Sequence, residues 1–382
     1  MKKKNFTLIL IHFDKEHFGK DFFLLPVYIR EVYGADVTIV YPQTHLNEDM
    51  PTTLRGVKLY PIKHAEGKSL NLYFLKVASF LLKNAKKIDI LMTFHIFMRA
   101  GKIALLYKLL NPKGKSYVKL DIPTYIADRI STFFNDNGAK AKLKKIIYKS
   151  YFNKVDLFSC ESTDAYNRLL NDQGLNPYFK DKLIILENGC DDQLIGELGV
   201  SPRAFNEKEN VFITVGRLGT FEKHTELFMQ ALERTDLKDW VVYMIGPVQE
   251  EFEVYVSDFF LRNPQLKDKV VFTGAIYDKK VLWDIYCKAK VFVLSSRTES
   301  SGIVLYEAKI FKDFIISTPV GASADVIADG CGCITDMNDP AVLSHILSSI
   351  TAGERKIDVY DNIDVTMLYW SNQVKKLDWI FK

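Results

Sequence analysis

Residues Lys290–Phe311 read KVFVLSSRTESSGIVLYEAKIF, a pattern that predicts a strand, a polar turn and a helix in succession. The unbroken apolar run Val291–Leu294 is typical of a strand covered on both faces, as in parallel sheets flanked by helices. Ser295–Gly302 then forms the turn at the carboxyl end of this strand, where ligands bind in open α/β sheets. The stretch therefore predicts an α/β domain with a ligand site at this turn.

Two carboxylates in the stretch, Glu299 and Glu307, are candidate ligand contacts. We expect Glu299 at the mouth of the turn and Glu307 two turns into the helix, so that they reach parts of one ligand on the order of 10 Å apart. The helix start also offers unpaired N–H groups and a partial positive charge to a phosphate. The alternative is that Glu299 caps the helix and Glu307 is a solvated helix residue.

The composition predicts a packed protein of two domains that does not span a membrane. The chain has 382 residues, of which 48% are hydrophobic, and a single core seldom grows past ~250–300 residues. No apolar run approaches the ~20 residues that a membrane-spanning helix needs. The amino-terminal sequence lacks a secretory cleavage site, so we expect a cytoplasmic protein. Five scattered cysteines favour reduced thiols over a disulfide framework.

Basic residues are concentrated in the first half of the chain. Residues 51–150 contain 20 Lys or Arg against five Asp or Glu, which indicates an anionic membrane surface, an anionic substrate or nucleic acid as partner. At the end of this region Ala139–Phe152, AKAKLKKIIYKSYF, predicts a basic amphipathic helix with Ile146 on its apolar side. Such a helix suits a membrane surface, and the alternative is a half-buried helix with a solvated face.

Strands and helices alternate through the first half, which favours a parallel sheet. Strands are expected at Phe6–Phe13, Asp36–Tyr41, Ile88–Phe94, Ser116–Leu120, Asp156–Ser159 and Leu183–Leu186. Helices are expected at Gly19–Tyr33, Leu70–Asn84, Ala100–Leu110, Ala139–Phe152 and Ser162–Leu170. A ligand could lie against the loop His12–Lys20, but the loop lacks the three spaced glycines of a dinucleotide site.

A second alternating series follows the polar stretch Gly196–Glu209, which is the expected domain boundary. Besides Val291–Leu294, its strands are expected at Val211–Val215, Trp240–Ile245, Val270–Thr273, Phe314–Ser317 and Gly332–Thr335. The closing segment Tyr369–Lys382 has the spacing of an amphipathic helix. We therefore predict domains at residues 1–196 and 210–365, and a terminal helical segment at 366–382.

Several ordered motifs of the second half resemble those of the retaining glycosyltransferases of family 4. They are Val215–Gly216–Arg217–Leu218 with Lys223, Gly274, Ser296 with Glu299–Ser300–Ser301–Gly302–Ile303–Val304, Glu307–Ala308, and Pro319–Val320–Gly321 with Asp325. Asn188–Gly189–Cys190–Asp191 resembles the segment that ends the first domain of the family. The resemblance implies the GT-B fold, with two facing Rossmann-like domains, parallel sheets and a final helix that returns to the first domain.

The resemblance also implies a donor site for a nucleotide-diphosphate sugar. Arg217 and Lys223 follow the end of a strand at Gly216 and supply two cations for a diphosphate, Arg as a planar fork and Lys as a point charge. By resemblance, Glu299 holds hydroxyls of the donor sugar. Glu307 accepts hydrogen bonds from the ribose hydroxyls, a role that suits an ionised carboxylate.

The same resemblance assigns roles to backbone groups and to the nucleobase site. The backbone amides of Ser301 through Ile303 approach the sugar and the phosphate, and Gly302 lets that backbone come close. Ile276 and Tyr277 are placed to meet the nucleobase, with packing at a helix start as the alternative. Many family members also carry a histidine after the fourth strand of the first domain. Either Asp121 replaces it in this chain or the alignment is shifted.

The family retains the anomeric configuration without an enzymic nucleophile, so the departing phosphate oxygen takes the proton of the acceptor. Stabilisation of charge on that phosphate is usually a large catalytic effect. No metal is required if Arg217, Lys223 and a helix N-terminus provide it, and the sequence has no Asp-x-Asp motif placed to bind one.

We therefore predict a retaining hexosyltransferase that uses a UDP- or GDP-sugar and a glycan or lipid-linked acceptor in surface polysaccharide, lipopolysaccharide or glycolipid biosynthesis. We expect it in the cytoplasm, either free or peripheral at the inner face of the cell membrane. The alternatives are a nucleotide-sugar epimerase of GT-B architecture and a non-catalytic nucleotide-sugar binder. Nucleic-acid binding would explain the basic half but not Glu299, Glu307 or Arg217.

Overall fold

The computed structural model describes residues 3–64, 70–121 and 138–382, which form two compact units. The first unit combines residues Met1–Asp191 with the terminal segment Tyr369–Lys382, and the second unit is Asp192–Leu368. The units thus separate at Asp191, before the polar stretch 196–209 in which the sequence analysis placed the boundary. That stretch belongs to the second unit because Phe205 packs against its core and the carbonyl of Ser201 accepts from Cys287 Sγ.

The first unit contains an eight-stranded sheet in the order β3-β4-β2-β1-β5-β6-β7-β8. All neighbouring strands are parallel except β3, which runs antiparallel to β4 at the edge. In the centre, Phe6 of β1 pairs with Val37 on one side and Ile90 on the other. The strands are β1 Asn5–Ile9, β2 Asp36–Gln43, β3 Thr53–Leu54, β4 Val57–Lys63, β5 Ile90–Phe94, β6 Lys115–Lys119, β7 Leu157–Cys160 and β8 Leu183–Ile185.

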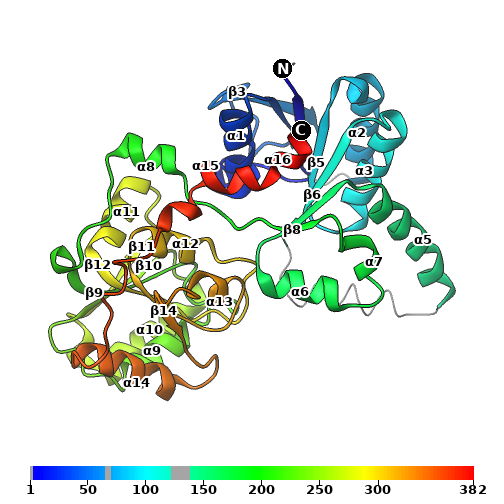
Figure 1. The fold of residues 1–382 in the computed structure, drawn as a ribbon. Coiled ribbons are helices and arrows are strands. Elements are labelled where there is room, and N and C mark those ends of the chain that lie inside the picture. Colours follow the sequence, from blue (N-terminus) through cyan, green and yellow to red (C-terminus); the bar gives the residue numbers. More distant parts are fainter. Residues whose placement is uncertain (1–2, 65–69, 122–137) are drawn as a thin grey trace. The chain divides into compact units, whose positions relative to one another are not determined.

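Helices cover both faces of this sheet (Figure 1). The core on one face contains side chains of α1 and the terminal segment, and the core on the other face contains side chains of α2 and α3. A further apolar cluster joins α5, α6 and α7 to β6, β7 and β8. The helices are α1 Asp21–Tyr33, α2 Leu70–Asn84, α3 Met98–Leu110, α5 Ala139–Lys154, α6 Thr163–Asn171 and α7 Asn176–Phe179.

The terminal segment packs within the first unit, as short helical turns. It comprises α15 Trp370–Gln373, the 3-10 turn Val374–Leu377 and α16 Asp378–Phe381. Trp370, Val374, Leu377 and Ile380 are buried in the core of the first unit, and Phe381 stacks on Tyr33 with the ring centroids 4.0 Å apart. The amphipathic spacing predicted Val374, Leu377 and Trp379–Phe381 as the apolar side, but Trp379 is 42% exposed and the segment is not one continuous α-helix.

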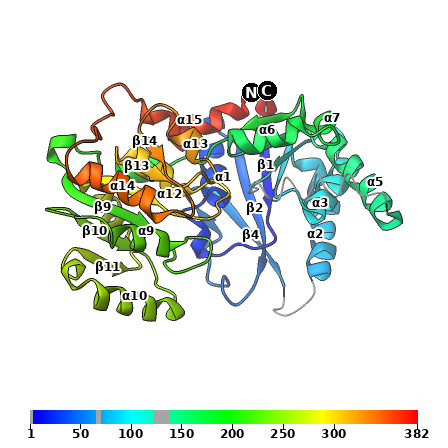
Figure 2. The same ribbon diagram turned by 90° about the horizontal axis from the view of Figure 1, so that it is seen from below.

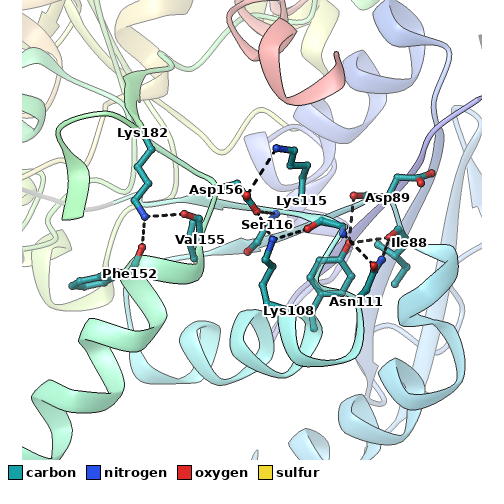
Figure 3. Close-up of polar contacts among 12 residues, drawn as sticks. Ile88, Asp89, Lys108, Asn111, Lys115, Ser116, Phe152, Val155, Asp156 and Lys182 are labelled. Atoms are coloured by element: carbon teal, nitrogen blue, oxygen red, sulfur yellow. Dashed lines mark hydrogen bonds and ion pairs between the residues drawn. The ribbon is translucent and has the colours of Figure 1, made fainter. Parts of the chain in front are cut away.

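Polar side chains tie the amino-terminal ends of the first unit's strands to its helices (Figure 3). Asp156 Oδ2 accepts from the backbone N–H of Ser116 at 2.8 Å and from Lys108 Nζ at 3.0 Å. Lys182 Nζ donates to the carbonyl of Val155 at 2.9 Å. Some of the basic residues of this unit therefore serve the fold itself, at the sheet edge opposite to the carboxyl ends where ligands bind.

The second unit contains a six-stranded parallel sheet in the order β11-β10-β9-β12-β13-β14 (Figure 2). Its strands are β9 Glu209–Val215, β10 Val241–Ile245, β11 Val270–Gly274, β12 Ala289–Leu294, β13 Phe314–Ser317 and β14 Gly332–Ile334. Its helices are α8 Asp192–Leu198, α9 Thr225–Leu232, α10 Glu250–Arg262, α11 Lys279–Lys288, α12 Ile303–Ile310, α13 Ser323–Val326 and α14 Pro340–Thr351.

Most expected elements are present, and seven helices and strands of the described residues were not anticipated. The strands β3 and β4 and the helices α7, α8, α10, α13 and α14 had no counterpart in the sequence analysis. In β4 the residues Val57 to Tyr60 alternate between buried and exposed, but Pro61 interrupts this pattern. The proline is tolerated because β3 pairs only with Val57 and Lys58, which leaves β4 without an outer neighbour at Pro61. None of the helices in the described residues is long and apolar enough to cross a membrane.

Candidate functional site

The second sheet has its topological switch point between β9 and β12. From β9 the chain continues outward to β10 and β11, whereas β12 begins the series that runs the other way to β13 and β14. Ligands bind outside the carboxyl ends of the strands at such a point. The loops that follow β9 and β12 contact each other, since the N–H of Arg297 donates to the carbonyl of Glu222 at 2.7 Å and Ser295 Oγ donates to that of Lys223 at 3.1 Å.

Glu299 and Lys223 meet at this point. Lys223 Nζ lies 2.6 Å from Glu299 Oε1, and Ser296 Oγ donates to the same oxygen at 2.7 Å. The aliphatic part of Lys223 crosses directly over Gly216, where an added Cβ would lie 3.1 Å from Lys223 Cε. Because Gly216 has no side chain, Lys223 can pass over it to reach the carboxylate of Glu299. The capping alternative for Glu299 is wrong, because the N-cap of α12 is Gly302 and no side chain caps it.

Two glycines shape the turn that carries Glu299. Gly302 has φ 83° and ψ 71°, a left-handed conformation that most other residues avoid. Gly321, in the loop after β13, packs against the turn, and a Cβ there would lie 2.9 Å from the carbonyl oxygen of Ser301. Ser301 is buried, and its side chain hydrogen bonds to the hydroxyl of Tyr306. At Ser301 a ligand can therefore contact only the backbone, which leads into the start of α12 at Ile303.

Glu307 lies in the fifth position of α12 and is only 5% exposed, so the alternative that it is solvated is wrong. Its Oε1 accepts from Lys279 Nζ at 2.6 Å and from Trp283 Nε1 at 2.9 Å. The sequence analysis did not select these two residues of α11. The sequence shows only that they are four residues apart, which puts both side chains on one face of a helix.

The other predicted donor-site residues of this unit lie near the ends of β9 and β11. Arg217 follows β9 in an exposed position, and its guanidinium has no hydrogen bond or ion pair within the described parts of the chain. Tyr277 is 90% exposed, and Ile276 is half-buried just before α11, whose N-cap is Asp278. The structure therefore brings Glu299 and Lys223 into direct contact and leaves Arg217 and Tyr277 open to solvent.

Asp121 belongs to the first unit, where it follows β6 with φ 40°. His95, directly after the neighbouring strand β5, has φ 66°, and its Nδ1 lies 3.9 Å from Asp121 Oδ2. Positive φ is uncommon for residues other than glycine, although Asp and His tolerate it better than most. The sequence analysis placed Asp121 after a strand end correctly but overlooked His95, which the same criterion would have selected.

A buried charge cluster lies beside Asp121. Lys119, the last residue of β6, is fully buried and contacts Glu161, Asp21 Oδ2 at 2.7 Å and Asn188 Oδ1 at 3.2 Å. Burial lowers the pKa of the lysine, but Asp21, Glu161 and Asp121 outweigh this and raise it well above its usual value. Burial raises the pKa of Glu161 in turn. The cluster joins α1 to the carboxyl ends of three strands, which is a structural role.

One group of side chains in the described residues could hold a metal ion. His12, Asp14 and His17 in the loop after β1 offer ligand atoms that all lie within 4.8 Å of one another. Asp14 Oδ2 lies 3.0 Å from His12 Nε2, and Asp14 Oδ1 lies 2.8 Å from His17 Nδ1. Burial lowers the pKa of His17, while Asp14 opposes this. Asp14 also accepts from the N–H of Glu16 and so caps a short 3-10 turn, which accounts for its position without a metal.

A family comparison identifies the domain that carries Glu299 and Glu307. Residues 201–362 match the model of the family described as glycosyl transferases group 1. This range contains every donor-site residue that the sequence analysis selected in the second half. The match confirms the predicted resemblance to glycosyl transferases group 1 for this domain, while the retaining subtype stays a prediction.

Two curated proteins are similar in sequence. The O-antigen chain mannosyltransferase C of Escherichia coli is 25% identical over 243 residues, which cover 61% of this chain and 62% of the relative. An uncharacterized 41.2 kDa protein in the cps region of Klebsiella pneumoniae is 27% identical over 149 residues, covering 38% of this chain and 39% of the relative. The matched regions thus span less than two thirds of the length of either relative.

Solved structures show that the fold is shared along nearly the whole chain. Sucrose-phosphate synthase from Thermosynechococcus elongatus superposes with a TM-score of 0.70 at 16% identity, covering 99% of this chain and 98% of its own. The lipopolysaccharide outer core galactosyltransferase WaaB gives 0.68 at 15% identity, and Anabaena HepE in complex with UDP and glucose gives 0.66 at 13%. Each of these two comparisons covers 98% of both chains. The prediction of two α/β units with parallel sheets, as in GT-B proteins, is confirmed.

Proposed function

We propose that the chain is a retaining hexosyltransferase that uses a nucleotide-diphosphate sugar, and the match of residues 201–362 to the glycosyl transferases group 1 supports this. The observation that carries the proposal is the arrangement at the switch point of the second sheet. Two carboxylates, Glu299 and Glu307, each accept from a lysine and a neutral donor there. A site with two positioned carboxylates, their two lysines and the additional cation Arg217 suits a ligand that combines hydroxyls with phosphates.

Each group of the donor has a proposed partner in this site. Glu299 accepts from hydroxyls of the sugar, and Glu307 uses its second oxygen for the ribose, because Oε1 is already occupied by Lys279 and Trp283. Arg217, Lys223 and the N-terminus of α12 bind the diphosphate. Ile276 and Tyr277 contact the nucleobase. The phosphate charge is met by protein groups, so the proposal includes no metal cofactor.

The proposed reaction proceeds on one face of the sugar. The bond between the anomeric carbon and the diphosphate oxygen breaks, and the acceptor hydroxyl oxygen bonds to the same carbon from the same side. Its proton passes to the departing phosphate oxygen. Arg217 and Lys223 stabilise the negative charge that develops on this phosphate, which is usually a large part of such catalysis.

We propose that the acceptor is a glycan or a lipid-linked glycan of surface polysaccharide or lipopolysaccharide biosynthesis. The support is the similarity to the O-antigen chain mannosyltransferase C and to a protein of a cps region. The same similarity makes GDP-mannose the first donor to test. UDP-glucose is the second, because the similar fold of HepE was solved with UDP and glucose.

The proposal is tested by thermal unfolding with each nucleotide sugar and by release of nucleoside diphosphate. A ligand at 100 times its dissociation constant adds ~2.7 kcal/mol to the unfolding free energy. A transferase releases nucleoside diphosphate in proportion to added acceptor, whereas an epimerase releases it without any acceptor. If none of the UDP- or GDP-sugars raises the melting temperature, the proposed donor site is wrong.

We further propose peripheral binding at the inner face of the cell membrane, with an anionic bilayer as partner. On α2, Leu75 and Leu82 are each 69% exposed and directly precede the exposed Lys76 and Lys83. On α5, Ile146, which the sequence analysis placed on the apolar side, is 65% exposed. Exposed apolar side chains beside lysines suit the interface of an anionic membrane.

The membrane proposal is tested with vesicles at low and high ionic strength. We expect binding to anionic vesicles that falls as salt rises, since each basic residue near the surface contributes ~1 kcal/mol. Replacing Lys140, Lys142, Lys144 and Lys145 with Gln should abolish it and leave transfer to a soluble acceptor intact. The side chains of Lys140 and Lys144 lie outside the described residues. Equal binding to neutral and anionic vesicles, or binding to neither, would contradict the proposal.

A further inference from the structure

The first unit has a cavity at the switch point of its own sheet. The central strand β1 lies between β2 and β5, and the cavity opens at the carboxyl ends of β1 and β5. Its volume is about 550 Å³, within the ~300–1,000 Å³ that small-molecule sites occupy. Residues of β1, β5, α1, α3 and α5 line it, and all of them belong to the first unit.

Most of the wall is apolar. Ile9 of β1 and Ile103 of α3 line it, and so do Phe22 and Phe94, whose ring centroids lie 4.3 Å apart. Phe97 also lines the cavity and is 50% exposed. A ligand with an apolar part would bury this ring together with the rest of the wall. These residues therefore select a ligand with an apolar part.

The first turn of α3 opens into the same cavity. Met98, Arg99 and Ala100 line it, the N-cap Phe97 provides no side-chain hydrogen bond, and the first turn contains no acidic residue. The Tyr148 side chain makes a hydrogen bond with the backbone of Met98. The amides of Arg99 and Ala100 have no acceptor within the helix, as at any helix start. A thirteen-residue helix that begins in this way favours an anion at its N-terminus.

The hydroxyl of Thr93 is a second, independent observation that points to a ligand in this cavity. This residue of β5 lines the cavity and is only 2% exposed, and its hydroxyl has no hydrogen-bond partner among the described residues. A buried hydroxyl without a partner is costly, and such groups usually bond to something in the functional state. A ligand oxygen in the cavity would accept this hydrogen bond.

The charged side chains around the cavity favour a ligand whose polar end is negatively charged. His12, His17, His95 and Arg99 line it, and in the part of the chain that the structure describes no carboxylate does. Two acids lie behind the histidines, since Asp14 is bonded to His12 and His17, and Asp121 Oδ2 lies 3.9 Å from His95 Nδ1. Arg99 has no such acid beside it among the described lining residues. A helix start, an unpaired hydroxyl and a guanidinium together suit the oxygens of a phosphate.

We infer that this cavity binds a phosphate ester that carries an apolar chain. Resting on the proposed function, this ligand is the acceptor or its anchoring part, and the lipid-linked class is favoured over a soluble glycan. The phosphate lies against the start of α3 and Thr93, and the chain follows the ring pair. A soluble sugar phosphate shares the phosphate chemistry but leaves the apolar wall uncovered, so the experiment compares the two.

The experiment measures binding of geranyl phosphate, geraniol and glucose 1-phosphate to the full chain by calorimetry without any nucleotide. Geranyl phosphate should bind at least about tenfold more tightly than either of the others, because each of those lacks one of the two matching parts. Thr93→Val and Arg99→Gln should each weaken geranyl phosphate by about tenfold. Thr93→Val should leave the melting temperature unchanged or raised, since the hydroxyl has no partner in the free protein.

Matched controls lie close by in the first unit. Ser116 is also a buried hydroxyl without a partner among the described residues, but it does not line the cavity, so Ser116→Ala should leave binding unchanged. Lys102 of α3 is exposed outside the lining, so Lys102→Gln controls for the loss of charge at Arg99. If geraniol binds as tightly as geranyl phosphate, the proposed phosphate site is wrong. If glucose 1-phosphate binds as tightly, the proposed apolar part is wrong. If none of the three ligands binds, both parts of the inference are wrong. Nucleotide-sugar binding that persists in any of these cases leaves the proposed function standing.

Discussion

The two sheets have switch points of the same kind, between β1 and β5 in the first unit and between β9 and β12 in the second. The second unit equips this position with paired carboxylates and lysines and with glycine-rich turns. The first unit equips it with an apolar cavity that has histidines and Arg99 at its polar parts. The fold fixes the place of a ligand, and the loops fix its chemistry.

The two units also differ in which residues adopt left-handed conformations near these points. The second unit uses mainly glycines there, with φ between 55° and 139° at Gly246, Gly274, Gly302 and Gly321, together with one histidine, His224, at φ 45°. The first unit uses His95 and Asp121. A glycine lets backbone approach backbone, as at Gly246, where a Cβ would lie 1.7 Å from the carbonyl oxygen of Gly216. A histidine or aspartate in this conformation keeps a side chain at the strand end at some cost in backbone energy.

The largest effect is expected from Glu299→Ala, which tests whether the second unit's edge binds the sugar. Transfer should fall by about 100-fold, because hydrogen bonds to a charged group contribute ~1.5–3 kcal/mol each. Affinity for free nucleoside diphosphate should change little, since the proposed partner of Glu299 is the sugar. Rates and calorimetric dissociation constants measure the two effects.

The exposed Glu222, in the loop before Lys223, provides the control for this change. Glu222→Ala removes a carboxylate from the same loop region and should leave transfer near the wild-type rate. If Glu299→Ala also retains transfer near that rate, Glu299 has only a structural role.

The next effect concerns the cations that distinguish the second unit's edge. Arg217→Ala should weaken nucleoside diphosphate binding by about tenfold or more, because it removes one charge-assisted contact. Lys223→Ala and Glu307→Ala should weaken it as well, although the former also breaks the ion pair with Glu299. Lys288→Ala, at an exposed position of α11, is the control. Unchanged affinity in all three variants would remove the proposed donor site.

The comparison also explains how much could be predicted from the sequence. In the second unit, the charged residues follow apolar strands in a fixed order, so the sequence led directly to Glu299, Glu307, Arg217 and Lys223. Two further contacts of Glu307, Lys279 and Trp283, come from a helix more than 20 residues earlier in the chain. No local pattern links them to Glu307, because only the packing of α11 against α12 brings them together.

In the first unit, the sequence predicted the alternation of strands and helices but not the cavity. Its walls are ordinary core residues such as Ile9 and Ile103, which periodicity cannot distinguish from packed ones. The cavity exists because the side chains of α1, α3 and α5 do not fill the space at this edge of the sheet. The unpaired hydroxyl of Thr93 is likewise visible only once its surroundings are known.

Asp121→Asn tests whether the first unit's edge contributes to the reaction. We expect turnover to fall by about fivefold, because the change removes the charge beside His95, and partly exposed pairs of this kind contribute up to ~1 kcal/mol. Donor affinity should change less than turnover. Asn tolerates a left-handed backbone, so the fold should persist. Full activity of this variant would mean that Asp121 has no role in turnover.

The smallest effect is expected from Trp283→Phe, which tests how precisely the second unit's edge positions Glu307. The indole N–H donates to Glu307 Oε1 at 2.9 Å, and Lys279 donates to the same oxygen at 2.6 Å. Because Lys279 remains, nucleoside diphosphate affinity should fall only by about threefold, in the lower part of the range for one hydrogen bond. Trp379→Phe, at a partly exposed position of the first unit, should leave affinity unchanged. A threefold loss with the melting temperature of the wild type would assign Trp283 to positioning, whereas equal affinities would show that Lys279 alone holds the carboxylate.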